Sequence, residues 1–386
     1  MKVLVNALSA RMGGIVTYTN NLLDAFEQRG IDVAVCVPNE FVTRERSSVH
    51  RLDVGHYRSI RRFAWEQTGW RRIVRRFNPD LLFSSANFGL LNSPVKQILL
   101  LREGGLFDPF YLAHMTAAQG LGYVVNRYFR RKLMLLSASH ADHIITPTFA
   151  MRDMVARWDP SIVDRCTVNP YGTINEVFKP TERERTWRAD GVLRLLYVSV
   201  YYPHKVPCLV CQAVDQLNST GMSAHARITM SLQELREMSG STLDKILMSD
   251  AQARGLITLG RHAYESLPAL YNAHDVFVFP SVSETFGHPM AEAMSSGLPL
   301  AVADTSVNRE ICGDAALYFP PFSVSGLVAA IRRLDEDPAL RQKLADAGRA
   351  RAVERFGWDD HVDRLVATFE AVAEGRTPTA LDWANA

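Results

Sequence analysis

The sequence predicts an α/β protein with two doubly wound domains, each a parallel sheet covered by helices. The length predicts the number of domains, because 386 residues are enough for about two domains of roughly 100–200 residues each. The order of elements predicts the sheet type, because short apolar runs alternate with helical patterns along the chain. The boundary is predicted at residues 170–190, where this alternation stops before it starts again.

The first domain is expected to begin with a strand at residues 2–6, which form a short apolar run. The pair Gly13-Gly14 then predicts a turn, and residues 15–28 have the apolar spacing of a helix. A second strand at 32–37 ends before a proline, and the strand, helix, strand order implies parallel pairing. Later strands are expected at 81–83, 97–101 and 143–146, which places the first domain at residues 1–175.

The second domain is expected at residues 190–357. The chain from 170 to 190 is polar and charged, as a linker is, and the apolar run 193–200 then predicts a new first strand. Further strands are expected at 227–230, 256–259, 276–279 and 299–303, and helices at 325–335, 338–355 and 358–373. Open parallel sheets bind ligands beyond the carboxyl ends of their strands, so two such Rossmann-like domains are expected to face a cleft.

The composition excludes several classes of protein. With 47% hydrophobic and 22% charged residues, the chain is expected to be globular and not disordered. The 43 basic and 41 acidic side chains nearly balance, so no binding to nucleic acid through phosphate neutralisation is expected. The charge is unevenly placed, because residues 1–190 carry 26 basic and 18 acidic side chains and the remainder carries 17 and 23. The basic half suits an anionic surface or acceptor.

The five cysteines are an odd number without the spacing of a disulfide framework, which indicates a reducing compartment. Cys208-x-x-Cys211 has the spacing of a redox or zinc pair, but it falls in an apolar run without a second pair or nearby histidines. Core packing is the better interpretation of this pair. Residues 1–8 are too short for a signal segment, and no run reaches about 18 apolar residues. The protein is therefore expected to be cytoplasmic.

Two carboxylates eight residues apart, Glu284 and Glu292, are the most informative pair in the sequence. Gly287 and Pro289 lie between them and predict a loop that ends where a helix begins, near Pro289. Glu292 is then expected in the first turn, with the N–H groups of residues 286–290 at the positive end of the helix. Free amides for an anion and carboxylates for sugar hydroxyls describe a nucleotide-sugar site. An acidic first turn that stabilises the helix dipole would explain Glu292, but neither Glu284 nor Gly287.

The stretch from residue 280 to residue 299, with Glu284-x7-Glu292 at its centre, resembles the donor motif of the family 4 retaining glycosyltransferases. The likeness covers most of the chain and includes Gly13-Gly14, Asn169-Pro170-Tyr171-Gly172 and the final helix that starts at Trp358. It implies the GT-B fold, in which that helix, at 358–376, returns to the first domain.

The resemblance implies a role for each residue of the motif. Glu284 would bind hydroxyls of the donor hexose, and Glu292 would bind those of the ribose. Gly13 and Gly14 would let the backbone of the first domain approach the donor diphosphate closely, as glycine allows. The sugar and the diphosphate would also be bound by backbone amides at the helix start, those of Phe286, Gly287 and His288.

Residues 198–205 are expected to be a strand that runs into a turn and ends in Lys205, which is well placed to meet an anion. Family members carry an Arg five residues before this lysine to neutralise the leaving diphosphate, and this sequence has Val200 there. Three outcomes stay open: Lys205 and helix-end amides suffice, turnover is weak, or another cation substitutes. The candidate cations are Arg102, His204 and Arg261. A surface lysine without a role is the alternative interpretation of Lys205.

The family's first domain often offers a histidine soon after a strand to bind the donor sugar. In this sequence the strand at 97–101 is followed instead by Arg102-Glu103-Gly104-Gly105. Arg102 and Glu103 are therefore candidates for contact with the acceptor or with phosphate, and a simple turn is the alternative. His114 is the nearest histidine and falls at a helical position, where a structural role is expected.

The sequence offers little support for a metal or another cofactor. The acidic cluster Asp335-Glu336-Asp337 lies between two helical patterns and is expected to be a solvated helix end. Lys205 and helix-end amides would take the place of a divalent cation at the diphosphate, and the resemblance likewise implies metal independence. The nucleoside diphosphate sugar is expected as a substrate and not as a cofactor.

Residues 57–77 form a basic stretch rich in aromatic side chains, joined later by the basic aromatic run at 127–132. Such a face would lie on an anionic membrane and present a lipid-linked acceptor, or would bind phosphate groups of the acceptor. The alternative is an ordinary helix whose arginines extend over a packed apolar stripe. Membrane contact is slightly favoured, which predicts a peripheral location at the inner face of the membrane.

These features predict a retaining, metal-independent glycosyltransferase that moves a hexosyl unit from a nucleoside diphosphate sugar to the hydroxyl of a glycan or lipid-linked acceptor. The departing diphosphate is expected to help deprotonate the acceptor, so that no protein nucleophile is needed. The stretch 61–67 resembles transferases of cell-surface polysaccharide assembly. The alternatives are a natural-product glycosyltransferase, an epimerase or phosphorylase on the same scaffold, and an inactive partner subunit. The sequence specifies neither the base, the sugar, the acceptor and its linkage, nor the oligomeric state.

Overall fold

The computed structural model describes residues 1–11, 14–54, 57, 59–114, 121–182, 185–236, 238 and 241–381. The chain forms two compact units, each built from stretches that are separated in the sequence. Unit 1 comprises residues 1–107, 125–170 and 359–386, and unit 2 comprises residues 108–124 and 171–358. Residues 108–124 thus belong to unit 2, whereas the sequence analysis placed them in the first domain.

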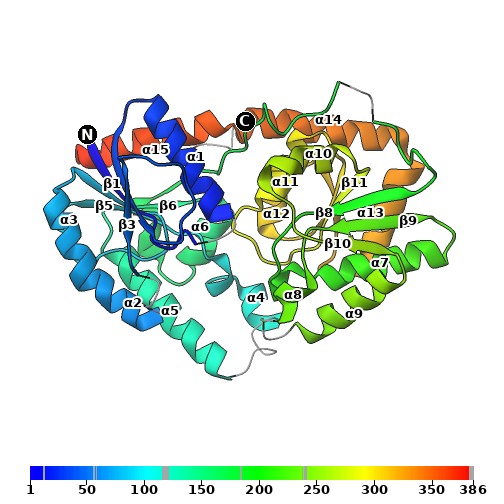
Figure 1. Ribbon diagram of the computed structural model, residues 1–386, viewed down its shortest axis with the longest axis horizontal. Helices are drawn as coiled ribbons and strands as arrows, with labels where there is room; N and C mark the ends of the chain where they lie inside the picture. Colours follow the sequence, from blue (N-terminus) through cyan, green and yellow to red (C-terminus); the bar gives the residue numbers. More distant parts are fainter. Residues whose placement is uncertain are drawn as a thin grey trace. The chain divides into compact units, whose positions relative to one another are not determined.

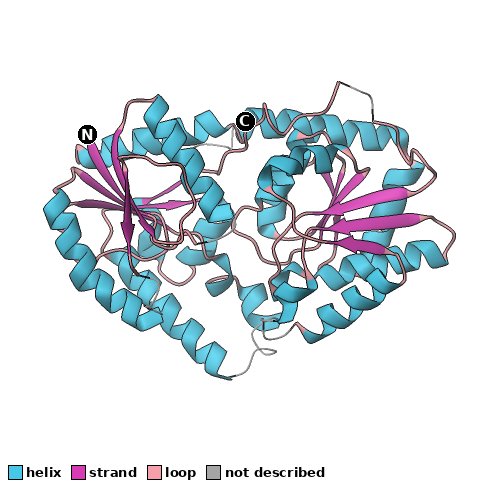
Figure 2. Ribbon diagram, in the orientation of Figure 1, coloured by secondary structure: helices cyan, strands magenta, loops and turns pink. Residues whose placement is uncertain are grey.

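Unit 1 contains a seven-stranded parallel sheet in the order β3-β2-β1-β4-β5-β6-β7 (Figures 1 and 2). Its strands are β1 (Lys2–Asn6), β2 (Asp32–Pro38), β3 (Val49–Leu52), β4 (Leu81–Ser84), β5 (Lys96–Leu100), β6 (His143–Thr146) and β7 (Cys166–Val168). The sequence analysis missed the two edge strands. β3 is partly exposed along its length and carries polar side chains, and β7 has only three residues, so neither forms an apolar run.

Helices cover the sheet of unit 1, as Figure 1 shows. They are α1 (Gly14–Gln28), α2 (Ser59–Trp65), the π-helix η1 (Glu66–Trp70), α3 (Arg71–Phe77), η2 (Gly104–Leu106), α5 (Leu121–Ser139), α6 (Phe149–Ala156), η4 (Pro160–Arg165) and α15 (Trp358–Ala373). Helix α15 comes from the far end of the chain and still packs in this unit. Its Phe369 ring lies 6.2 Å from the Phe26 ring of α1 and 5.0 Å from the Phe83 ring of β4.

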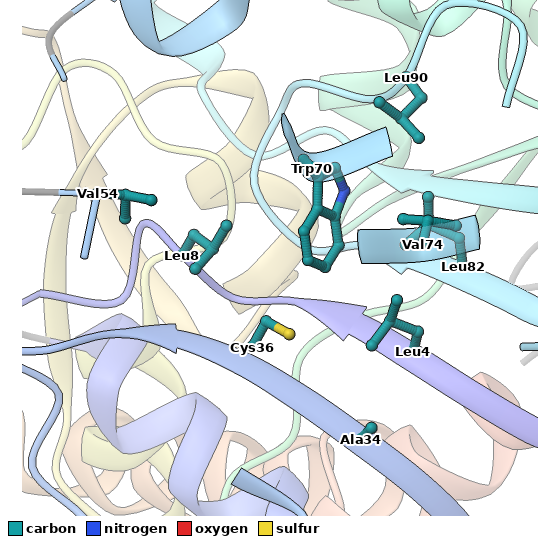
Figure 3. Packing of buried hydrophobic residues seen from close by; sticks show 9 residues of the cluster. All are labelled: Leu4, Leu8, Ala34, Cys36, Val54, Trp70, Val74, Leu82 and Leu90. Carbon is teal, nitrogen blue, oxygen red and sulfur yellow. The ribbon is translucent and has the colours of Figure 1, made fainter. Parts of the chain in front are cut away.

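The core of unit 1 beside β1 and β2 consists of nine buried side chains, shown in Figure 3. They are Leu4, Leu8, Ala34, Cys36, Val54, Trp70, Val74, Leu82 and Leu90. The indole ring of Trp70 and the Val74 side chain come from η1 and α3, so the segment 57–77 supplies part of this core. Tyr57, Trp65 and Phe77 pack against the same cluster. The aromatic rings of the basic stretch are thus mostly used inside the unit.

Unit 2 contains a six-stranded parallel sheet in the order β10-β9-β8-β11-β12-β13 (Figures 1 and 2). Its strands are β8 (Leu193–Tyr197), β9 (Ala224–Ile228), β10 (Ile257–Leu259), β11 (Val276–Phe279), β12 (Leu300–Ala303) and β13 (Ala316–Phe319). The strand order reverses between β8 and β11, which are neighbours in the sheet. In open parallel sheets the crevice for a ligand lies at such a reversal, outside the carboxyl ends of the strands.

The helices of unit 2 confirm the predicted alternation with strands. They are α4 (Pro109–His114), η5 (Pro203–Lys205), α7 (Pro207–Ser219), α8 (Leu232–Arg236), α9 (Thr242–Ala253), η6 (Tyr264–Ser266), α10 (Leu267–Asn272), α11 (His288–Ser295), α12 (Ser306–Cys312), α13 (Val324–Glu336) and α14 (Pro338–Arg355). Cys208 and Cys211 lie on α7 and are buried, as the core interpretation predicted, and burial raises the pKa of both thiols. None of the described helices is long and apolar enough to cross a membrane.

Helix α4 joins unit 2 through aromatic contacts, which explains why residues 108–124 leave the first domain. The ring of Phe110 stacks on that of Phe322 at 5.7 Å, and Tyr111 meets the His204 ring edge-on at 5.5 Å. Tyr111 is buried. Ring contacts of this kind depend on pairing between segments far apart in the sequence, so no local pattern could have predicted them.

Candidate functional site

Two loops meet at the strand reversal of unit 2. One loop follows β8 and carries Lys205, and the other follows β11 and carries Glu284. The backbone joins them, because the N–H of Val282 donates to the carbonyl of His204 at 3.0 Å. The Tyr197 hydroxyl, at the end of β8, donates to the carbonyl of Lys205 at 2.7 Å. The two loops are therefore held together before any ligand arrives.

Lys205 and Glu284 form an ion pair across this junction. The Lys205 Nζ lies 2.5 Å from Glu284 Oε1, and the two side chains are only 12% and 10% exposed. The ammonium group also lies 5.7 Å from the centre of the Phe279 ring, so one side of it faces an apolar surface. A charge pair so little exposed is held firmly, because removing one partner leaves the other charge buried and uncompensated. The sequence analysis named both residues but did not predict their contact.

The turn after Lys205 is strained. Val206 has φ 45° and ψ 51°, a left-handed conformation that a β-branched residue rarely adopts, and it precedes Pro207 at the start of α7. Such a residue costs about 1–3 kcal/mol and persists only where its surroundings enforce it. The surroundings here are the Tyr197 bond to Lys205 and the burial of the Val206 side chain. The position of the lysine is therefore fixed by its backbone.

The loop after β11 enters helix α11 through Gly287, which confirms the predicted turn. Gly287 has φ 82°, a conformation that favours glycine, and a Cβ added there would lie 2.5 Å from the Met290 Cε, so the end of that flexible side chain would have to move. The helix begins at His288, with Pro289 in its first turn. Backbone N–H groups at such a helix start attract an anion, because the first turn has no carbonyl partners for them.

Two ring side chains flank this helix start. The His288 ring stacks on Tyr171 at 4.8 Å with an interplanar angle of 28°. The Phe286 ring is buried and meets Tyr171 at 5.5 Å and Phe356 at 5.4 Å, both edge-on. Tyr171 belongs to the segment Asn169-Pro170-Tyr171-Gly172 of the sequence analysis, and its ring contacts both side chains at the helix start. The backbone at 286–288 is thereby held in a fixed conformation.

Glu292 differs from its prediction. It is the fifth residue of α11, so the predicted place in the first turn is wrong, and the alternative interpretation as an acidic first turn that stabilises the helix dipole does not apply either. Its side chain is buried, and the Tyr271 hydroxyl of α10 donates to its Oε2 at 2.7 Å. Burial raises the pKa of Glu292 to about 7, while the hydrogen bond from Tyr271 lowers it. The sequence analysis missed Tyr271, which lies in a short helical stretch without charged neighbours.

Arg261 and His204, two of the cations proposed to substitute at position 200, each have contacts of their own. Val200 is 47% exposed. Arg261 forms an ion pair with Glu234 of α8, and the guanidinium is largely exposed. The His204 ring lies between two tyrosine rings, stacked on Tyr202 at 5.6 Å and edge-on to Tyr111 at 5.5 Å. His204 is thus close to Lys205 in sequence and is oriented by aromatic neighbours.

The candidates of the first domain lie in unit 1. The Arg102 backbone N–H donates to Asn87 Oδ1 at 2.7 Å. Glu103 pairs with Arg130 of α5 at 2.5 Å. Gly14 is the first residue of α1, and an added Cβ there would meet nothing within 4 Å. Gly13 and the side chain of His114 lie outside what the structure describes.

The acidic cluster at 335–337 lies at the end of α13 as predicted, and Glu336 and Asp337 are exposed, but Asp335 is not solvated. The Asp335 side chain is only 13% exposed and pairs with Arg188 at 3.0 Å. It also accepts a hydrogen bond from the Trp187 indole N–H at 2.7 Å. Asp337 accepts from the Leu340 N–H at 2.9 Å and so caps α14. In the described part of the chain, no three His, Cys, Asp or Glu side chains are grouped so that they could hold a metal ion.

Comparison with known proteins gives both halves of the chain a match. Residues 12–173 match the model described as Glycosyltransferase Family 4, and residues 178–351 match Glycosyl transferases group 1. The O-antigen chain mannosyltransferase B of Escherichia coli is 29% identical over 175 residues, which are 45% of this chain and 45% of that protein. This chain thus spans about half the length of that curated relative.

Solved structures resemble the whole chain. The sucrose-phosphate synthase of Thermosynechococcus elongatus is 18% identical with a TM-score of 0.79, over 97% of this chain and 100% of that one. HepE of Anabaena, solved with UDP and glucose, is 15% identical with a TM-score of 0.71, over 96% of this chain and 100% of the other. At identities this low, the likeness shows a shared fold and nothing further.

Proposed function

The chain belongs to the family 4-like glycosyltransferases with the GT-B fold, and from this premise we propose that it transfers a hexosyl unit from a nucleoside diphosphate sugar to an acceptor hydroxyl. The observation that carries the proposal is the Lys205–Glu284 pair at the strand reversal of unit 2. It joins a cation for a diphosphate to a carboxylate for sugar hydroxyls, next to the amide groups at the start of α11.

The proposed mechanism is stabilisation of the leaving diphosphate. The backbone of Lys205 is held by the Tyr197 hydrogen bond and by the strained turn that follows it, so it needs no rearrangement as charge develops on the departing oxygen. The donor exchanges the ion pair for two new contacts, the diphosphate with Lys205 and the hexose hydroxyls with Glu284. The acceptor hydroxyl then attacks the anomeric carbon on the face from which the diphosphate leaves. The bond from that carbon to the diphosphate breaks, and the departing diphosphate takes the hydroxyl proton, so the anomeric configuration is retained.

The remaining residues of the motif bind the donor. Glu292 accepts hydroxyls of the ribose, and the amides of Phe286, Gly287 and His288 bind the diphosphate and sugar. In this proposal Lys205 and the amides together take the place of the arginine that family members carry at the position of Val200. No divalent metal takes part. Gly13, Gly14, Arg102 and Glu103 of unit 1 are proposed for contact with the diphosphate or acceptor, and Arg261 for contact with phosphate.

The relatives support a proposal for the acceptor class. The Escherichia coli relative is named for the O-antigen chain, so we assign this chain to cell-surface polysaccharide or glycolipid assembly, with a glycan or lipid-linked acceptor at the inner face of the membrane. HepE was solved in complex with UDP and glucose, which favours a uridine donor as the first to be tried. We place the protein in the cytoplasm and expect no nucleic acid among its partners.

The experiment that tests the proposal measures release of nucleoside diphosphate from a panel of nucleotide sugars, with and without candidate acceptors. Release that needs an acceptor supports transfer. Lys205→Ala is expected to lower the rate at least 100-fold, since the cation acts mainly in the transition state. Lys205→Arg keeps the charge and is the matched control, expected to retain more activity than the alanine variant. Equal activity of Lys205→Ala and the wild type would contradict the proposal.

One observation favours a second candidate, an inactive GT-B subunit. Val200, which stands where the family has a cationic side chain, is an exposed apolar residue and offers nothing to a phosphate. Calorimetry with nucleoside diphosphates separates the two, because an inactive subunit binds none or binds without turnover. An epimerase or a phosphorylase on this scaffold would act on its sugar substrate without a sugar acceptor.

A further inference from the structure

Helix α5 of unit 1 presents an apolar face to solvent. The side chains of Val125, Tyr128, Phe129 and Leu136 are 45%, 48%, 52% and 40% exposed. With the exposed Lys132 they recur every three or four residues, so they lie along one face of the helix, which we call the α5 face. Large apolar side chains gathered on one face mark a contact surface, whereas single exposed ones need no explanation.

The opposite side of α5 is tied into unit 1. Met134, Ser137 and Ala138 are buried. The Arg127 guanidinium donates to the carbonyl of Gly105, and Arg130 pairs with Glu103 at 2.5 Å. The helix is therefore anchored through one side, and the exposure of the α5 face is a consequence of that orientation.

Basic groups surround the rings of the α5 face. The Arg131 guanidinium lies 3.6 Å from the centre of the Trp158 ring, which is itself 44% exposed. The Tyr128 ring has cations on two sides, Arg131 at 5.8 Å and Lys132 at 5.7 Å. Aromatic rings interleaved with Lys and Arg are typical of helices that lie in the headgroup layer of a membrane.

We infer that the α5 face, together with Trp158, docks on an anionic membrane surface. Charge decides between a lipid surface and an apolar protein partner, because the rings are bordered by Arg131 and Lys132 and residues 1–190 carry 26 basic against 18 acidic side chains. Each Lys or Arg near such a surface contributes about 1 kcal/mol, and the apolar side chains add burial in the headgroup layer.

This surface replaces the stretch 57–77 as the apolar part of the contact. Trp70 is fully buried, and Trp65 packs against the core and stacks on Tyr57 at 5.6 Å. The exposed charged side chains among its described residues are all basic, namely Arg61, Arg72, Arg75 and Arg76. Those arginines add positive charge to unit 1 but no apolar group that could enter a membrane.

Docking by α5 deepens the proposed function. Only its link to a lipid-linked acceptor rests on that function, and the docking itself does not. The test is cosedimentation of the full chain with phosphatidylcholine vesicles, with and without phosphatidylglycerol. The wild type is expected to bind the anionic vesicles, and to bind them less at high salt. The double variant Tyr128→Ser, Phe129→Ser is expected to bind at least about tenfold more weakly than the wild type, because it removes the largest apolar groups.

Two controls make the result decisive. Val353 of α14 in unit 2 is 47% exposed, so Val353→Ser removes a similarly exposed apolar side chain elsewhere and is expected to leave binding unchanged. Lys132→Glu is expected to weaken binding to anionic vesicles only. Equal binding by the double variant and the wild type, equal binding to neutral vesicles, or loss of self-association in the double variant would overturn the inference. Transfer to a soluble acceptor is a separate readout, so failure of the proposed function would leave vesicle binding intact.

A second inference rests on an independent contact in unit 2. The Tyr271 hydroxyl donates to Glu292 Oε2 at 2.7 Å, and Tyr271 is fully buried. Its ring is held by Phe178 at 5.8 Å and by Phe277 at 5.9 Å. We propose that Tyr271 is a positioning residue, which orients the Glu292 carboxylate so that Oε1 meets the hydroxyls of the donor ribose. The role of Glu292 as a ribose ligand comes from the proposed function.

The ionisation of Glu292 gives this contact a distinct readout. Burial raises the pKa of Glu292 to about 7, and the Tyr271 hydrogen bond opposes that rise by favouring the carboxylate. The other elements packed on α11 present Arg349 of α14, which donates to the Ser295 carbonyl, and Cys312 of α12, beside Met290. Loss of the Tyr271 hydroxyl would therefore raise the pKa of Glu292 further.

The experiment is calorimetry with UDP and other nucleoside diphosphates on both sides of pH 7, for the wild type and Tyr271→Phe. Wild-type affinity is expected to increase as the pH rises through about 7, and the variant is expected to need a higher pH for the same increase. Tyr318→Phe removes another hydroxyl hydrogen bond in unit 2, to the Gly313 carbonyl, and is the control for a merely structural loss. An unchanged profile in Tyr271→Phe would overturn the inference, whereas no binding by the wild type would count against the proposed function instead.

Discussion

The loops at the strand ends of the two units use their charged side chains differently. In unit 2, Lys205 after β8 pairs with Glu284 after β11, two loops that are 79 residues apart. In unit 1, Glu103 after β5 pairs with Arg130 on α5, the next long helix. The first pair is only 12% and 10% exposed and the second 41% and 31%. The pair in unit 2 is thus more shielded from water than the pair in unit 1, and only in the proposed function is it exchanged for contacts with a ligand.

The largest expected effect tests this difference directly. Glu284→Ala is expected to lower the rate of glycosyl transfer at least 100-fold, which is about 3 kcal/mol in the activation free energy. The reason is that the hydroxyls of the donor hexose lose their contact with the Glu284 carboxylate. Glu103→Ala is expected to lower the rate by no more than about tenfold, because it removes only one proposed contact and this carboxylate is already paired with Arg130. Both are measured by steady-state assays with one donor and acceptor. A similar loss in Glu103→Ala would show that Glu103 is as important for transfer as Glu284.

A second prediction concerns stability and pH in unit 2. The pKa of Glu292 is raised from 4.5 to about 7, so the folded protein keeps a proton that the unfolded chain releases. The contribution of Glu292 to stability is complete below about pH 4.5, declines as the pH rises to about 7, and is constant above that, a loss of roughly 3 kcal/mol at most.

Denaturant unfolding of the wild type and Glu292→Gln between pH 4 and pH 8 measures this loss. The glutamine variant is expected to show a smaller decline over that interval, since an amide does not titrate. Parallel curves for the two proteins would mean that Glu292 keeps an ordinary pKa.

The third prediction compares one glycine from each unit. Gly287→Ala is expected to destabilise the protein by about 1–2 kcal/mol, because φ is 82° and the new Cβ would meet Met290. Gly14→Ala has open space around the new Cβ and lies in a helix, so it is expected to be neutral or to stabilise by up to about 1 kcal/mol. Thermal melting measures both. Transfer lost in Gly14→Ala without loss of stability would support close approach of the donor to this backbone.

The smallest effect is expected at the pair that anchors α5. Arg130→Ala should lower the free energy of unfolding by less than about 1 kcal/mol, since the pair with Glu103 is partly exposed. Chemical denaturation of this variant beside Lys205→Ala makes the comparison between the units quantitative, because the less exposed Lys205–Glu284 pair is expected to cost more to break. An equal cost at both pairs would remove the distinction.

The sequence predicted the fold well because strands and helices leave local patterns. The strands β1, β6 and β11 and the helices α14 and α15 have the bounds that apolar periodicity indicated. Strands β3, β7 and β13 were missed, since β3 and β7 lie at sheet edges and β13 is a run of four residues whose place depends on its neighbour β12.

The candidate residues could be named from the sequence, but their contacts could not. Lys205, Glu284 and Gly287 were named because a lysine after a strand, a carboxylate in a loop and a glycine before a helix each leave a local signal. The contact of Tyr271 with Glu292 leaves none, because it joins two helices through a side chain of ordinary type. For the same reason the rings of the stretch 57–77 were taken for a surface, although Trp70 packs inside the sheet's core.

Unit 1 is assembled from three separate stretches of chain, and the last of them has a consequence for how the protein is made. The ribosome delivers the strands β1 to β7 early, but Phe369 of α15, which covers Phe26 and Phe83, emerges only after all of unit 2. Until α15 is synthesised, the Phe26 and Phe83 side chains of the nascent chain are therefore not covered by it. Exposed apolar surface of this kind is what chaperones bind. Translation halted before Trp358 should yield chains in which unit 2 resists protease and unit 1 does not.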